Sequence, residues 1–206
     1  MKNLITALSL AALAACAPEV QTSSGKAFLA QGPIKDADVA AAASVEPAPL
    51  RFPARIGVIR FVWGTVETFP ADEKKALLAD LPEDLGTLTQ LGRLETALSR
   101  TPDLRITNVN AMRRLAASRH LDYLLVVSLD PYQNTAEALF LDVRTGYPHG
   151  SIEVSGPGRG VTGFFGYRPT NPNKINRATR RLARALKPQL DMLADDLLAQ
   201  SGDRHL

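Results

Sequence analysis

The chain has 206 residues, of which 45% are apolar and 22% are charged, and its net charge is +3 with neutral histidines. That length allows one domain of ordinary size with a substantial core. A single cysteine excludes intramolecular disulfides, so we expect the fold to hold together without them.

The first fifteen residues read as an export signal. Lys2 supplies a positive charge, Leu4–Leu13 form a short apolar run, and small residues precede Cys16. This pattern predicts a secretory signal peptide over residues 1–15. The run is shorter than the roughly 20 apolar residues that span a bilayer, and no later stretch approaches that length.

The end of this signal resembles the lipobox of bacterial lipoproteins, because the sole cysteine, Cys16, falls at the cleavage position. The resemblance implies cleavage after Ala15 and lipid attachment to the sulfur of Cys16, which anchors the mature chain to a membrane. Ala17 at the second mature position, in place of aspartate, implies the periplasmic face of the outer membrane.

Residues 16–53 are expected to form the lipidated N-terminus and a flexible tether. The stretch is rich in proline, serine, glycine and alanine, so it can bury little apolar surface to offset the entropy of ordering. A flexible coil of this length spans roughly 35 Å, enough to clear the lipid headgroups.

The periplasmic domain is predicted over residues 54–200, followed by a polar tail over 201–206. Arg55–Trp63 is rich in β-branched and aromatic residues and predicts a strand. A helix is expected after Pro70, with Asp72 and Glu73 in its first turn. Leucines at helical spacing predict a second helix over Thr87–Arg100.

Further elements are predicted in the rest of the domain. Asp122–Leu129 is apolar almost throughout, as expected of a central strand covered on both faces. A long helix with an apolar stripe, kinked at Pro188, closes the domain. The remaining elements are a strand at Leu104–Val109, a helix at Ala111–Arg119 capped by Asn110, a hairpin of Ala136–Arg144 with Ser151–Ser155, and the final helix at Lys174–Gln200. The alternation predicts an α/β sandwich of two or three layers, with a mixed sheet flanked by helices.

Three segments, Ile56–Phe61, Leu121–Ser128 and Leu141–Gly146, resemble the strands of CsgG-type envelope lipoproteins. The layout is also similar to that of rhombotarget lipoproteins, which share an early apolar strand and a later segment of aspartate, apolar strand and serine. The resemblance implies a periplasmic scaffold for secretion or assembly at the outer membrane, and a homo-oligomeric ring of the kind that CsgG relatives form.

No catalytic, cofactor or metal site is predicted. His120 is expected at a helix end, His149 in a turn and His205 in the tail, and none has a second ligand at metal-binding spacing. Ser128 has no neighbouring base, and no nucleophile elbow is present. Carboxylates are expected to be solvated on helix surfaces, among them Glu73, Glu83, Asp84 and Glu95. These patterns favour a protein that is not an enzyme.

A glycine-rich loop, Gly156–Gly166, is the first of two candidate interaction surfaces. Its side chains for partner contact are Arg159, Phe164, Phe165 and the following Tyr167. The alternatives are a plain connection, or a small-ligand or nucleotide-like binding domain in which backbone amides approach a phosphate. The loop lacks the Gly-Lys-Ser/Thr of a P-loop.

The first half of the final helix is the second candidate surface. Its cations oppose the helix dipole, which favours anions at this end, so helix stability does not explain them. They are Arg168, Lys174, Arg177, Arg180, Arg181, Arg184 and Lys187. They suit anionic lipid headgroups or an acidic envelope protein, although a solvated helix face accounts for them equally well. Given an envelope location, we expect no nucleic-acid partner. The sequence thus favours a non-enzymatic adaptor or assembly factor.

Overall fold

The computed structural model describes residues 47–62, 65–92, 109–156 and 172–202. The predicted signal peptide, Cys16, most of the tether and the strand at 104–108 lie outside these ranges. No helix within the described ranges is long and apolar enough to cross a membrane.

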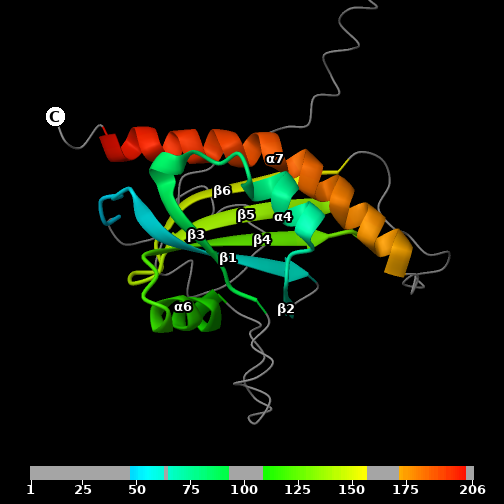
Figure 1. Cartoon of the computed structure of the whole chain (residues 1–206), viewed down its shortest axis with the longest axis horizontal. Helices are drawn as coiled ribbons and strands as arrows, with labels where there is room; N and C mark the ends of the chain where they lie inside the picture. Colours follow the sequence, from blue (N-terminus) through cyan, green and yellow to red (C-terminus); the bar gives the residue numbers. More distant parts are fainter. Residues whose placement is uncertain (1–46, 63–64, 93–108, 157–171, 203–206) are drawn as a thin grey trace, which may run out of the picture.

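A six-stranded mixed sheet forms the centre of the domain (Figure 1). Its strands run in the order β2-β1-β4-β5-β6, and β3 also pairs with β1. The β1 strand is parallel to β4 and β3 and antiparallel to β2, while β4, β5 and β6 form an antiparallel meander. The strands are β1 Ala54–Val62, β2 Thr65–Glu67, β3 Gly86–Gln90, β4 Tyr123–Asp130, β5 Thr135–Asp142 and β6 Pro148–Ser155.

Helices cover both faces of this sheet and confirm the predicted α/β sandwich. Figure 1 shows α4 and α7 on one face and α6 on the other. The helical segments are α4 Ala71–Leu78, the short 3₁₀ turn η2 Glu83–Leu85, α6 Val109–Ser118 and α7 Pro172–Gly202. The long C-terminal helix is confirmed, and it contains Pro188. Its axis changes direction near the middle of the helix, as expected of an internal proline.

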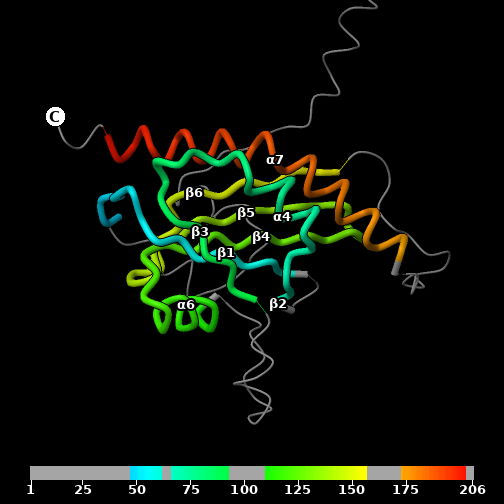
Figure 2. Tube along the Cα trace, in the orientation of Figure 1, coloured from blue at the N-terminus to red at the C-terminus, as the bar shows by residue number. Residues whose placement is uncertain are grey.

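Two apolar clusters fill the space between the layers. On β4, Leu125, Val127 and Leu129 face the cluster beneath α4 and α7, whereas Leu124 and Val126 face the cluster beneath α6. Successive strand residues point to opposite faces, so a strand buried on both sides must be apolar at nearly every position. The prediction of a central strand covered on both faces is confirmed, and the Cα trace in Figure 2 shows β4 between β1 and β5.

The predicted helix over Thr87–Arg100 is wrong in its first part, which is strand β3. Leu88 and Leu91 have helical spacing, but exposed Thr87 and Thr89 alternate with the half-buried Leu88. Parallel pairing with β1 decides the outcome, since tertiary contacts routinely override local propensity. Residues 93–100 lie outside the described ranges.

The two ends of α6 differ in how well they match the prediction. Asn110 is not the N-cap as predicted, because it lies within the helix, where its Oδ1 accepts a hydrogen bond from Arg113 Nη1 at 2.9 Å. At the other end, His120 adopts a left-handed conformation with φ 55°. The amides of His120 and Leu121 donate back to the carbonyls of Ala117 and Ala116, at 2.9 and 3.1 Å. This pattern is a Schellman cap, so His120 ends the helix as predicted.

Candidate functional site

The outer face of α7 presents a row of cations to solvent. Lys174, Arg177, Arg181 and Arg184 are all exposed, and their spacing of three, four and three residues places them on one side of the helix. The opposite side packs on the sheet through Ala178, Leu182 and Leu186. We call these four residues the basic stripe. None of them forms an ion pair with another described residue.

Two other cations of the predicted set have partners and do not belong to the stripe. Arg180 points toward α4, where its Nη1 lies 3.5 Å from Asp72 Oδ2. Lys187 pairs with Asp191 one turn later along α7. Of the predicted run of cations, four thus lie on the exposed side of α7 and two form ion pairs, while Arg168 lies outside the described residues.

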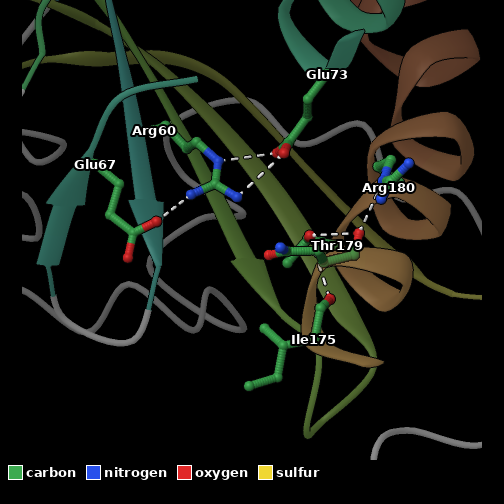
Figure 3. Close-up of polar contacts among 7 residues, drawn as sticks. Arg60, Glu67, Glu73, Ile175, Thr179 and Arg180 are labelled. Atoms are coloured by element: carbon green, nitrogen blue, oxygen red, sulfur yellow. Dashed lines mark hydrogen bonds and ion pairs between the residues drawn. The ribbon is translucent and has the colours of Figure 1, made fainter. Parts of the chain in front are cut away.

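The N-terminal half of α7 is held against the domain by buried contacts. Thr179 is only 2% exposed, and its hydroxyl donates within the helix to the carbonyls of Ile175 and Asn176, at 3.3 and 3.1 Å (Figure 3). Because this buried hydroxyl has acceptors within its own helix, it needs no hydrogen-bond partner elsewhere in the core. Apolar packing fixes the orientation of the stripe. The charges do not help to hold the helix in place, because the helix dipole opposes cations at this end.

Beneath α4, a buried arginine links three elements. Arg60 on β1 is 4% exposed and holds Glu73 of α4 by two hydrogen bonds, Nε to Oε1 at 2.9 Å and Nη2 to Oε2 at 3.1 Å. A third bond runs from Arg60 Nη1 to Glu67 on β2. Figure 3 shows the guanidinium between the two carboxylates. Every nitrogen of the guanidinium is thus engaged, which makes the group a structural tie and not a ligand for substrate.

The prediction that Glu73 is solvated is wrong, because it is 1% exposed. A neglected signal was Arg60 itself, a cation among the apolar residues of Ile56–Val62. Such a residue needs a carboxylate partner when the strand is buried. By contrast, Glu83 and Asp84 are exposed as expected, and Glu95 lies outside the described residues.

A second buried acid, Glu137, was also missed. It lies on β5, is 9% exposed, and sits directly across from Glu153 of β6 and Ser128 of β4 in the strand register. Burial, and then the charges of Glu153 and Asp130, raise the pKa of Glu137 to about 8. Among the described residues, no cation pairs with it. Glu137 therefore holds a proton near neutral pH.

A cavity of about 660 Å³ opens at the end of the sheet where β4 begins. Three of its polar groups form hydrogen bonds within the protein. Burial disfavours the charged form of Asp122, but hydrogen bonds and charge from Arg55 outweigh it and lower the pKa of this carboxyl. The Tyr123 hydroxyl accepts the amide of Arg51 at 2.9 Å, and burial raises its pKa. Asp142 accepts the amide of Thr145 at 2.6 Å. Asp122, Tyr123 and Asp142 are thus engaged within the protein.

The histidines are placed apart. His120 is exposed at the end of α6, and His205 lies outside the described residues. His149 was predicted in a turn, but it is buried in β6, with its ring centroid 5.1 Å from Tyr147 and 5.8 Å from Tyr123. An aromatic environment at the sheet end explains its burial. Within the described ranges, no three His, Cys, Asp or Glu side chains gather where they could hold a metal ion.

The glycine-rich loop is reached only at its first residue. Gly156 donates its amide to Asn134 O at 2.7 Å and so ends β6 against the turn between β4 and β5. Arg159, Phe164, Phe165 and Tyr167 lie outside the described residues. The 660 Å³ cavity is at the other end of β4 and β5, away from Gly156. That cavity therefore offers no support for ligand binding at the loop.

Comparison with known proteins found no matching family and no matching curated protein. Among the solved structures similar to this chain are two of PelC dodecamers from Paraburkholderia phytofirmans, one of them a single-residue variant. Each is 15% identical to this chain, and the match covers 84% of this chain and 97% of the other. The TM-scores are 0.38 for the variant and 0.37 for the other. Likeness at this level says nothing about what this chain binds or how it assembles.

Proposed function

We propose that this chain is a lipoprotein of the outer membrane, anchored through Cys16, whose periplasmic α/β domain is a non-enzymatic adaptor that binds an acidic envelope protein through the basic stripe. The stripe is the observation that supports the proposal most strongly. Its four cations extend over about 15 Å of helix, point into solvent and have no described partner.

The placement of the stripe favours contact over stability. Lys174 lies in the first turn of α7, where a cation opposes the helix dipole by about 0.3–1 kcal/mol. Apolar packing of Leu182, Leu186 and Leu190 anchors the helix regardless of these charges. The helix fixes the backbone positions of these cations before a partner binds, and the cations steer an acidic partner by long-range attraction.

Charge reversal tests the proposal in cells. The full chain with Arg177→Glu and Arg181→Glu should lose its crosslinked adducts with envelope proteins after mild crosslinking. A matched variant, Arg114→Glu and Arg119→Glu, makes the same charge change at exposed positions on and just after α6, the helix of the other face, and should keep them. Equal adducts from wild type and both variants would contradict the proposal.

Anionic lipid is the competing contact. The chain with Cys16→Ser can be mixed with vesicles that contain phosphatidylglycerol or only phosphatidylcholine. Stripe-dependent binding to the anionic vesicles, with no protein adduct in cells, would assign the stripe to the membrane and overturn the adaptor role. Binding to neither kind of vesicle, with adducts that depend on the stripe, would support it.

Two earlier expectations stay predictions. Homo-oligomerisation is tested by sedimentation of the chain with Cys16→Ser. Binding of a small or nucleotide-like ligand at Gly156–Gly166 has no support from the described residues. Saturable phosphate binding to the full chain would favour it over a purely adaptor function.

A further inference from the structure

The β3 edge of the sheet has main-chain groups turned away from any described strand. Among the described strands, β3 pairs only with β1, and in this ladder the amide of Leu91, just past its end, donates to Val58 O at 2.9 Å. Alternate residues of a strand direct their N–H and C=O groups to opposite sides. The groups of Leu88 and Gln90 therefore point outward, and among the described residues no strand pairs with them.

A groove of about 370 Å³ lies beside this edge, between β3 and α4. Its floor and walls are mostly apolar, and two lysines of α4 stand among them. The lining residues are Val58, Ala71, Leu78, Ala79, Leu88, Lys74, Lys75 and Gln90. The side chains of Leu88 and Gln90 line the groove while their backbone groups face outward. One extended segment could thus meet both.

The two charged side chains that line the groove are both cations, and a third polar group is an unpaired hydrogen-bond donor. Lys74 and Lys75 are exposed and form no ion pair with a described residue. Gln90 Nε2 is buried and has no hydrogen-bond acceptor. A buried donor without an acceptor destabilises the protein, so a partner that supplies one gains binding energy. The side chains that line the groove thus offer positive charge and an unpaired donor but no negative charge, which a carboxylate-bearing segment would bring.

We propose that the β3 edge takes up an extended acidic segment of a partner protein as an additional strand, with apolar side chains in the groove and carboxylates at Lys74 and Lys75. Pairing with an open edge supplies main-chain hydrogen bonds, while pockets for alternate side chains supply specificity. This surface is separate from the basic stripe and from Cys16, so either of those assignments can fail without affecting it.

A defined peptide tests the proposal on the full chain in detergent. The probe is the blocked octapeptide Glu-Thr-Val-Thr-Val-Thr-Glu-Thr, which puts two valines flanked by two glutamates on one face of a strand. Its twin has lysine in place of both glutamates. We expect the acidic peptide to bind at least about tenfold more tightly than the basic one at low salt. Binding should also protect the amides of Leu88 and Gln90 from hydrogen exchange.

Variants separate charge from position. Lys74→Glu with Lys75→Glu should reverse the preference between the two peptides. Arg114→Glu with Arg119→Glu, an equal charge change elsewhere, should leave it unaltered. Two N-methylated forms of the acidic peptide, blocked at the valine or at the threonine amides, should differ, because only one set of amides faces β3.

Several results would overturn the proposal. They are no binding of the acidic peptide, equal binding of the two charge types, equal binding of both N-methylated forms, or a preference insensitive to reversal of the two lysines. A further contrary result is self-association of the full chain that reversal of Lys74 and Lys75 abolishes. In that case the occupant of the edge is a second copy of the chain.

Discussion

The two faces of the sheet each bury a glutamate, and the two residues have opposite surroundings. Glu73 is 1% exposed and receives two hydrogen bonds from Arg60. Glu137 is 9% exposed and faces the carboxylates of Glu153 and Asp130. The first is bound within a network of hydrogen bonds from Arg60, while the second retains a proton near neutral pH. Burial alone therefore does not determine the role of an acid; its neighbours do.

Removing the hydrogen-bond partner of Glu73 should have the largest effect on stability. Arg60→Met removes the only described cation paired with Glu73 and leaves a buried charge, so we expect a loss of about 3–5 kcal/mol in the free energy of unfolding. Adding Glu73→Gln should recover much of that loss. Chemical denaturation of the three chains checks this. A double variant as unstable as Arg60→Met would show that the ion pair is not the cause.

The contribution of Glu137 to stability should depend on pH. Because the pKa of Glu137 rises from 4.5 to about 8 on folding, the folded chain binds the proton more tightly than the unfolded chain. The stabilisation from this group is present below about pH 4.5 and is lost as pH rises toward 8, by up to about 5 kcal/mol. Glu137→Gln should remove this slope and stabilise the chain above pH 8. Glu83→Gln, at an exposed acid, should leave the slope unchanged, and the same slope in Glu137→Gln would refute the assignment.

An exposed pair should matter least. Arg180 and Asp72 join α7 to α4, but both side chains are more than half exposed. Solvent screening limits such pairs to about 0–1 kcal/mol. Asp72→Asn should therefore shift the unfolding free energy by less than about 1 kcal/mol, which a denaturation curve can resolve. A larger loss would mean that the α4–α7 contact depends on this pair more than on its apolar packing.

The elements that were predicted well are those with a strong periodic pattern. Strand β4 and helix α7 each have an apolar pattern long enough to exclude other structures. Strand β3 was missed because five residues with two threonines give a weak local signal, and only its pairing with β1 decides its conformation.

The residues of the candidate site follow the same rule: those placed by a strong periodic pattern could be predicted, and those placed by tertiary contacts could not. Exposure of Arg177, Arg181 and Arg184 could be predicted because they lie opposite a clear apolar stripe. The pairing of Arg180 with Asp72 could not, since it depends on how α4 is placed against α7. Charged residues inside apolar strands, such as Arg60 and Glu137, were the available signal for the buried groups.

Lipid attachment at Cys16 is the claim on which the envelope role depends. Intact-mass spectrometry of the full chain from its native host tests it most directly. The account predicts a mature chain that begins at Cys16 and has the added mass of acyl chains, and Cys16→Ser should lack this mass and leave the membrane fraction. A wild-type chain without an acyl adduct would contradict the account.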